Sequence, residues 1–240
     1  MAELSLVVEE AEAEFTSLRQ LVAHSEVQTD GQYILGPQAR VAAINACVLY
    51  VAAAFEEATR QLGNAYVDAL ATKALIPAVR LDALKAGLWE RAATSLSSRP
   101  FGVRDFQPAD AQKNLKILKD FCLDSSDLQL MKNNAVYNYR NMRTKEVNKV
   151  FKRLGIDDIC NKVGRCAEFK AFFLVDAVSK AQDKFIAYLN DFYDIRNLAT
   201  HELGTFRSQG NVDALRYVEF FDISIRRLAS VLEDDLRQIT

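Results

Sequence analysis

The sequence has few glycines, prolines and histidines, and it carries no large excess of charge of either sign. Its 240 residues include 9 glycines, 4 prolines and 2 histidines, and its formal net charge at pH 7 is -2. Because glycine and proline punctuate turns, their scarcity argues against an all-β fold and favours long helices. The near-neutral charge gives no global basic signature, so a nucleic acid would have to bind through a local basic patch.

The sequence also lacks paired metal-binding cysteines and a basic-then-apolar leader. None of the four cysteines forms a Cys-x-x-Cys pair (Cys47, Cys122, Cys160, Cys166), whereas a zinc site needs about four ligands with paired spacing. We therefore expect no metal and no other cofactor, and we interpret the thiols as reduced and buried. We also expect no apolar run long enough to span a bilayer. The acidic start, unlike a secretion signal, leads us to expect a cytoplasmic protein with no membrane partner.

Hydrophobic residues at helical spacing account for both ends of the chain. The pattern predicts helices over 3–27, 38–62 and 212–237, and a helical region over 167–203 with a break near Ser179. The 38–62 helix is rich in alanine, so neighbouring helices can approach it closely, and we expect it to be the central buried helix. Gly63 and Asn64 are expected to end it, and Asp30-Gly31 predicts a turn between the first two helices.

Residues 64–160 differ from the two ends because their helical patterns are shorter. We expect helices near 65–75, 81–93, 110–121, 127–132 and 145–154, an extended piece at 136–140, and a turn at 161–165. The fold class expected is all-α, an up-down helical bundle with a helical insertion in the middle of the chain. It would be one domain, 1–240, with core helices over 3–63 and 167–238 and the insertion over 64–160.

Two features outside the C-terminal region leave two interpretations each. Glu56 and Glu57 interrupt the apolar surface of the central helix, either as a solvated helix end or as a carboxylate facing a polar site. The basic segment 130–153 also carries tyrosines. It is either a solvated amphipathic helix beside a loop, or a surface that holds phosphates and stacks bases. Its candidate RNA-binding residues are Arg140, Arg143, Lys145 and Lys149.

The one compact set of catalytic side-chain types lies at Arg196, Asn197 and His201. On a helix, Asn197 and His201 share a face, whereas Arg196 and His201 are about 140° apart around the axis. A partner surface, most simply a second copy of the helix, would bring them together. Histidine can transfer a proton near neutral pH and arginine can bind a phosphate, which suits transfer at an RNA phosphodiester. The alternative is a capping and salt-bridge cluster with Asp191, Asp194 and Glu202 as partners.

The stretch Arg196-Asn197-Leu198-Ala199-Thr200-His201 resembles the Arg, polar residue, then His signature of the HEPN (higher eukaryotes and prokaryotes nucleotide-binding) superfamily. Residues 39–57 resemble the central helix of the RiboL-PSP-type HEPN proteins, and residues 141–156 resemble the segment before their last helices. The resemblance implies a HEPN-like up-down bundle that forms a homodimer, with Arg196, Asn197 and His201 of both chains facing each other across the two-fold axis.

The resemblance further implies a metal-independent endoribonuclease that cleaves RNA through 2′-OH attack, in a toxin–antitoxin or anti-phage defence system. Its partners would be the RNA substrate, a second copy of the chain and an antitoxin or other defence-system protein. The alternative function is a non-catalytic HEPN module that binds a nucleotide or a partner protein in such a system.

Overall fold

The structure is a computed structural model that describes residues 2–97, 112, 116, 119, 132, 136, 141–201 and 210–239. For Ala2, 91–97 and His201 it describes the backbone only. Within these residues the expected all-α class is confirmed, because eight helices and one two-stranded sheet make up the regular structure. In chain order they are α1 (Ala2–Ser25), β1 (Gln28–Thr29), β2 (Gln32–Tyr33), α2 (Pro37–Ala71), α3 (Ala78–Ser97), α6 (Thr144–Lys152), α7 (Ile159–Gly164), α8 (Ala167–Phe172), α9 (Val178–His201) and α10 (Asn211–Gln238).

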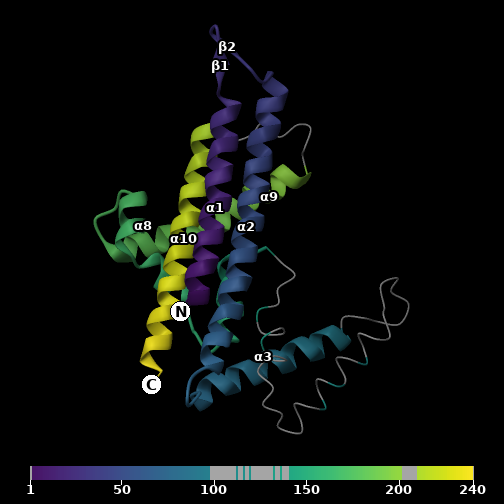
Figure 1. The fold of residues 1–240 in the computed structure, drawn as a ribbon, viewed down its shortest axis with the longest axis vertical. Helices are drawn as coiled ribbons and strands as arrows, with labels where there is room; N and C mark the ends of the chain where they lie inside the picture. The colour runs from purple at the N-terminus through teal and green to yellow at the C-terminus, as the bar shows by residue number, and fades with distance from the viewer. Residues whose placement is uncertain are drawn as a thin grey trace.

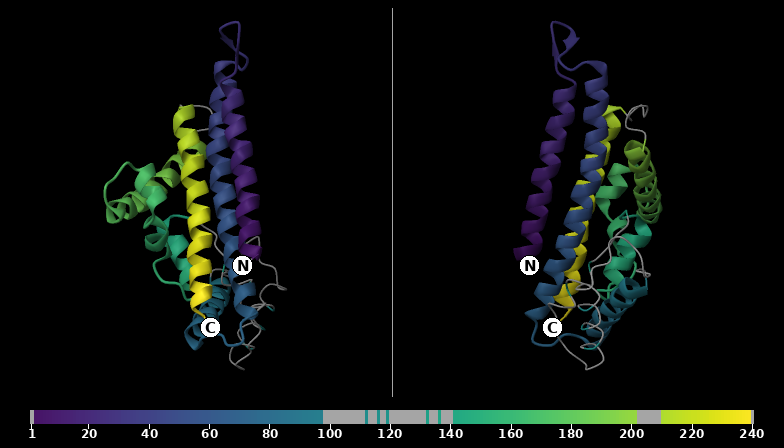
Figure 2. Two further views of the ribbon diagram at one scale, coloured as in Figure 1. Left: turned by 60° about the vertical axis from the view of Figure 1, so that its left-hand side comes forward. Right: turned by 90° about the vertical axis from the view of Figure 1, so that its right-hand side faces the viewer.

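Three long helices, α1, α2 and α10, pack side by side and form the body of the molecule (Figure 1). α1 runs towards the β1–β2 hairpin at one end, and both α2 and α10 run back from that end. α9 lies against α2 on the other side from α1, and α6, α7 and α8 pack near it (Figure 2). α3 leaves the far end of α2 at an angle. This arrangement places the region around Arg196 beside the middle of the central helix.

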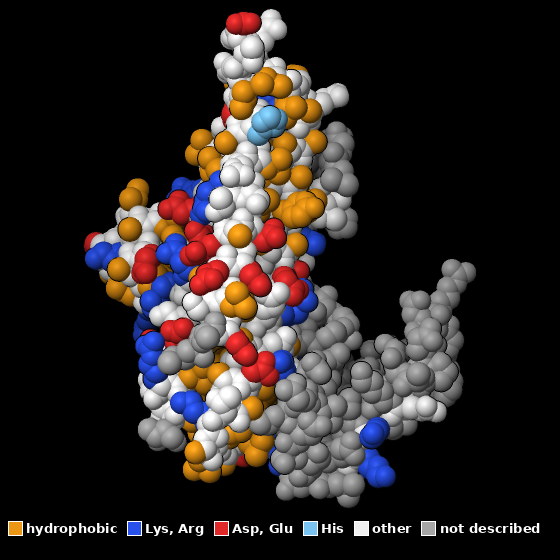
Figure 3. All heavy atoms as spheres, in the orientation of Figure 1, with side chains coloured by type: hydrophobic (Ala, Val, Ile, Leu, Met, Phe, Trp, Pro, Cys, Tyr) orange, Lys and Arg blue, Asp and Glu red, His pale blue; other side chains and the backbone are white. Residues whose placement is uncertain are grey.

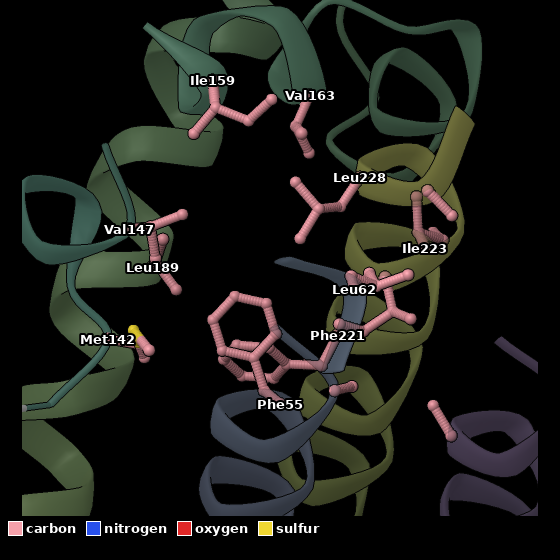
Figure 4. Close-up of a cluster of buried hydrophobic side chains, with 14 of the residues drawn as sticks. Phe55, Leu62, Met142, Val147, Ile159, Val163, Leu189, Phe221, Ile223 and Leu228 are labelled. Carbon is pink, nitrogen blue, oxygen red and sulfur yellow. The ribbon is translucent and has the colours of Figure 1, made fainter. Parts of the chain in front are cut away.

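The core is aromatic where α2, α9 and α10 meet. Phe55 of α2 and Phe221 of α10 have ring centroids 4.7 Å apart, and Phe192 of α9 lies 4.5 Å from Phe221. Figure 4 shows Phe55 and Phe221 together, with Leu189 of α9 and Leu228 of α10 around them. Rings that bury this much area supply a large part of the packing energy of a core. The expected role of α2 as the central buried helix is therefore confirmed.

Two local predictions are wrong because tertiary packing overrides the sequence signal. Gly63 does not end α2, which continues to Ala71; a Cβ atom at Gly63 would lie 2.6 Å from Cγ1 of Val136, so this glycine serves close packing inside a helix. Residues 161–165 are not a turn, since α7 covers Ile159–Gly164 and buries Ile159 and Val163.

Other predicted boundaries agree with the structure. The turn at Asp30-Gly31 is confirmed, with both residues at positive φ (53° and 77°) between two paired strands. The break before Ser179 is confirmed as the segment between α8 and α9. The predicted helices at 110–121 and 127–132 and the extended piece at 136–140 lie largely outside the described residues.

The expectation that no apolar run is long enough to span a bilayer is wrong for α2. By length and composition alone, α2 is long and apolar enough to cross a membrane. It is the one helix among the described residues for which this holds. It is also the core helix of the bundle, with 44% of its most apolar stretch buried inside the chain. A buried core helix passes the same test, so α2 is weak support for membrane insertion.

Candidate functional site

Arg196 reaches the interior because it lies on the buried face of α9. Leu189 and Phe192 are fully buried, and Arg196 follows them at helical spacing. Arg196 and Asn197 are each partly buried; Arg196 is close enough to Glu56 of α2 to affect its charge, and Asn197 contacts the segment that leads into α6. The two residues that the sequence singled out are therefore together at a packed junction.

Asn197 is held by the segment before α6. Nδ2 of Asn141 donates a hydrogen bond of 2.8 Å to Oδ1 of Asn197, and a guanidinium N–H of Arg196 donates a long one of 3.5 Å to the same oxygen. The backbone N–H of Thr144 donates to Oδ1 of Asn190, one of several contacts that fix this segment on α9. The Asn197 carboxamide is thereby oriented through its oxygen.

Three polar atoms at this junction are buried without a hydrogen-bond partner among the described residues. They are Oε1 of Glu56, the phenolic oxygen of Tyr193 and Nε of Arg196. Most buried polar atoms in native proteins have a partner, and each one without a partner costs about 1–3 kcal/mol. Similar atoms occur elsewhere among the described residues, for example Nε of Arg40 and of Arg227, so these three show that the junction is polar and buried.

Burial and charge shift the acid–base behaviour of this group. Burial raises the pKa of Glu56, although the Tyr193 hydroxyl and the charge of Arg196 oppose the rise. Burial also raises the pKa of Tyr193 well above its usual value, and the neighbouring Glu56 carboxylate raises it further. The phenol and the carboxylate thus lie close enough for each to shift the pKa of the other.

The structure distinguishes between the two glutamates of α2. Glu56 faces the junction with Arg196 and Tyr193. Glu57 is exposed, accepts an ion pair of 2.7 Å from Arg60 and a hydrogen bond from Gln61. The carboxylate facing a polar site is therefore Glu56, and Glu57 belongs to the solvated surface.

The acids expected in a structural cluster around Arg196 do not all join it. Asp194 forms an ion pair of 2.5 Å with Arg143, whose hydrogen bond lowers the pKa of Asp194. Asp191 is exposed, and Glu202 lies outside the described residues. Among the acids that the structure describes, the one that the charge of Arg196 influences is therefore Glu56.

Two of the candidate RNA-binding residues of the basic segment are engaged in ion pairs. Arg143 binds Asp194, and Lys149 lies 2.6 Å from Glu90 of α3. Burial opposes ionisation of Glu90, but the hydrogen bond from Lys149 and the charge of Arg153 lower its pKa overall. Lys145 is exposed on α6, and Arg140 lies outside the described residues.

His201 is the last helical residue of α9, and its side chain lies outside the described residues. The backbone from Arg196 to His201 is an unbroken helix, so the angular separation expected between these two positions holds for the main chain. The three described cysteines are buried free thiols (Cys47, Cys160, Cys166), and Cys122 lies outside the described residues. Within the described part of the chain, no group of three or more His, Cys, Asp or Glu is placed to hold a metal ion.

Sequence reasoning missed two members of the junction. Tyr193 precedes Arg196 by three residues and therefore lies on the same face of the helix. This spacing could have identified it, but Tyr193 also fits the apolar pattern of the core. Asn141 carries no local signal, because its role depends on the packing of the segment before α6 against α9.

Comparison with known proteins adds no relative to this description. No family model matches the chain, and neither the curated proteins nor the solved structures contain a match.

Proposed function

We propose that the chain is a metal-independent endoribonuclease that acts as a homodimer, in a toxin–antitoxin or anti-phage defence system. Arg196 binds the scissile phosphate, Asn197 orients it, and His201 transfers protons. The proposal rests on the resemblance of 196–201 to the HEPN signature and on the junction formed by Arg196, Asn197 and Glu56.

The single observation that carries the proposal is the state of the Arg196 guanidinium. Its Nε is buried without a partner among the described residues. The adjacent carboxyl group, Glu56, has a raised pKa because it is buried. An arginine with an unpartnered N–H donor beside an acid whose ionisation is opposed by burial suits an incoming anion, and a phosphate oxygen accepts from guanidinium N–H groups with favourable geometry.

The oriented amide of Asn197 fits the same role. Its oxygen is occupied by Asn141 and Arg196. The amide N–H groups are therefore the ones that would contact a phosphate oxygen. Together with Arg196 they would stabilise the negative charge that grows on the nonbridging oxygens during transfer.

The reaction needs no nucleophile from the protein, because RNA supplies the ribose 2′-hydroxyl. A bond forms between the 2′-oxygen and phosphorus as the bond from phosphorus to the 5′-oxygen breaks. The 2′-hydroxyl proton passes to a base, and the leaving 5′-oxygen receives a proton. The products are a 2′,3′-cyclic phosphate and a 5′-hydroxyl. His201 is the group suited to these transfers near neutral pH.

The separation of Arg196 and His201 around α9 supports the dimer. One helix directs the two side chains about 140° apart, and α9 is an uninterrupted helix from Val178 to His201. Pairing two copies across a two-fold axis would let Arg196 of one chain act with His201 of the other.

Of the candidate RNA-binding residues in the basic segment, we propose that Lys145 contacts the RNA. This side chain is exposed, whereas Lys149 is paired with Glu90 at 2.6 Å. We expect Lys145→Ala to weaken binding of a noncleavable 2′-O-methyl RNA and to reduce the salt dependence of binding, with Lys149→Ala having a smaller effect. Equal effects of the two changes would argue against this contact.

A second candidate function, a non-catalytic module that binds a nucleotide, is favoured by the presence of Glu56. A carboxyl group beside Arg196 competes with a phosphate whenever it is ionised, which favours binding that is tuned by pH over rapid turnover. This candidate predicts phosphate-dependent binding that survives His201→Ala, with no RNA cleavage.

The test is cleavage of end-labelled tRNA and mRNA by the purified chain in excess EDTA. We expect the native protein to cut and His201→Ala to be inactive. His24→Ala is the matched control, because His24 is the other histidine of the chain and is exposed on α1. Cleavage by His201→Ala at the native rate, or loss of cleavage in His24→Ala alone, would refute the assignment.

A further inference from the structure

A groove of about 480 Å³ runs between α1 and α2. Its floor is made of small side chains, among them the buried Ala11 of α1 and Ala58 of α2, and its rim carries the exposed Glu10 and Glu14 of α1 and Glu57 of α2. The groove lies away from α10, because Glu57 is about 200° around α2 from Phe55, the residue that packs on α10. It is separate from the junction around Arg196.

The apolar part of this surface is available to a partner. Tyr50 lines the groove and is 62% exposed, and Ala53 is exposed beside it. An alanine floor lets a third helix approach two others closely, and an exposed tyrosine is a frequent anchor of protein interfaces. α2 thus packs on α1, α9 and α10 and still exposes Tyr50 and Ala53 at the groove.

The charge of the rim identifies the class of partner. The first 18 residues contain Glu3, Glu9, Glu10, Glu12 and Glu14 and no Lys or Arg. Glu10 and Glu14 are four apart on one helix, where like charges repel, and neither has an ion-pair partner among the described residues. Figure 3 shows acidic side chains spread over the front of α1 and α2, with hydrophobic side chains between them.

This charge argues against two other occupants. A second copy that docks by the same face would place glutamates against glutamates, and RNA would bring its own negative charge to the rim. A cationic amphipathic helix fits both the charge and the apolar surface of the groove. Its basic side chains would pair with the rim, and its apolar face would cover Tyr50 and the alanines.

We infer that the α1–α2 groove is a docking site for a basic amphipathic helix of a partner protein. The inference is independent of the ribonuclease proposal, since the groove shares no residue with the Arg196 junction. Its test therefore fails or succeeds separately from any cleavage assay.

The probe is a fluorescent synthetic amphipathic helix of leucine and lysine, with a scrambled peptide of the same composition as its control. Binding to the full chain is followed by anisotropy at low and moderate salt. We expect Glu10→Gln/Glu14→Gln/Glu57→Gln to weaken binding about tenfold at low salt and to flatten its salt dependence. The variant Ala53→Trp, which fills the groove from an exposed position, should weaken binding without removing a charge.

The matched control is Asp82→Asn/Asp157→Asn/Asp183→Asn, which removes the same number of exposed charges away from the groove. Retained binding in this control supports the site. Equal weakening in both triple variants, equal binding of the scrambled peptide, or no binding to the native chain would overturn it. Sedimentation gives a further check, because a dimer that Ala53→Trp dissociates would assign the groove to a second copy instead.

Discussion

Replacing Glu56 by glutamine should stabilise the fold at neutral pH. The change keeps the shape of the side chain and removes its charge. Two effects oppose each other: the change removes the attraction between the Glu56 carboxylate and Arg196, and it relieves the cost of holding a charged carboxylate away from water, which is several kcal/mol per buried ion. The pKa of Glu56 is raised by burial despite Arg196, so burial outweighs the pairing. We expect a net gain on the order of 1 kcal/mol.

The pH dependence of this gain has a definite sign. Because the folded-state pKa of Glu56 lies above its unfolded value, the folded protein holds this proton more tightly than the unfolded chain does. The native protein therefore loses stability as the pH rises from the unfolded pKa to the folded pKa. The advantage of Glu56→Gln should be largest near neutral pH and should disappear at about pH 4, close to the unfolded pKa of glutamate.

The assay is urea unfolding followed by circular dichroism at about pH 7.5 and about pH 4. Glu57→Gln is the matched control; this neighbour is exposed and should change stability by no more than about 0.5 kcal/mol. The reasoning would be refuted if Glu56→Gln were less stable than the native chain at neutral pH, or if its advantage grew on acidification.

Three further predictions concern the fold. Phe55→Ala should destabilise the chain by about 3–5 kcal/mol in urea unfolding, because this ring is 2% exposed and packs at a tilt against a phenylalanine of α10; a loss under 1 kcal/mol would contradict its place in the core. Asp235→Ala should cost about 3 kcal/mol, since it removes the acceptor of Tyr66 (2.6 Å) and of Arg80 (2.5 Å), and a melting temperature equal to the native value would argue against this network. Gly63→Ala should cost about 1 kcal/mol despite the better helix propensity of alanine, because the added methyl group would lie 2.6 Å from a valine methyl carbon, and stabilisation would show that the valine moves freely.

The long helices could be predicted from the sequence because their apolar spacing is strong and their ends carry turn residues. Asn211–Gln238 and Ala2–Ser25 agree with their predicted ranges within about two residues. Gly63 misled the prediction because a glycine inside a helix and a glycine at a helix end look alike in sequence. Only the packing against α2 distinguishes them.

The candidate site could be predicted only in part. Periodicity placed Arg196 on the inward face of α9, and the burial of Phe192 and Leu189 agrees with it. The choice of Glu56 over Glu57 depends on the rotation of α2 against α9, and the contribution of Asn141 depends on a long-range contact. The local sequence predicts neither contribution, because both depend on contacts between residues that are far apart in the chain.

The most direct test of the ribonuclease proposal is the cleavage of one RNA oligonucleotide and of the same oligonucleotide with a 2′-deoxyribose at the cut nucleotide. Both are treated in excess EDTA with the native chain and with His201→Ala. The proposal predicts that only the native chain cuts, that it cuts only the all-RNA substrate, and that the product ends in a 2′,3′-cyclic phosphate. Cleavage of the deoxy-substituted substrate, or cleavage by His201→Ala, would contradict it.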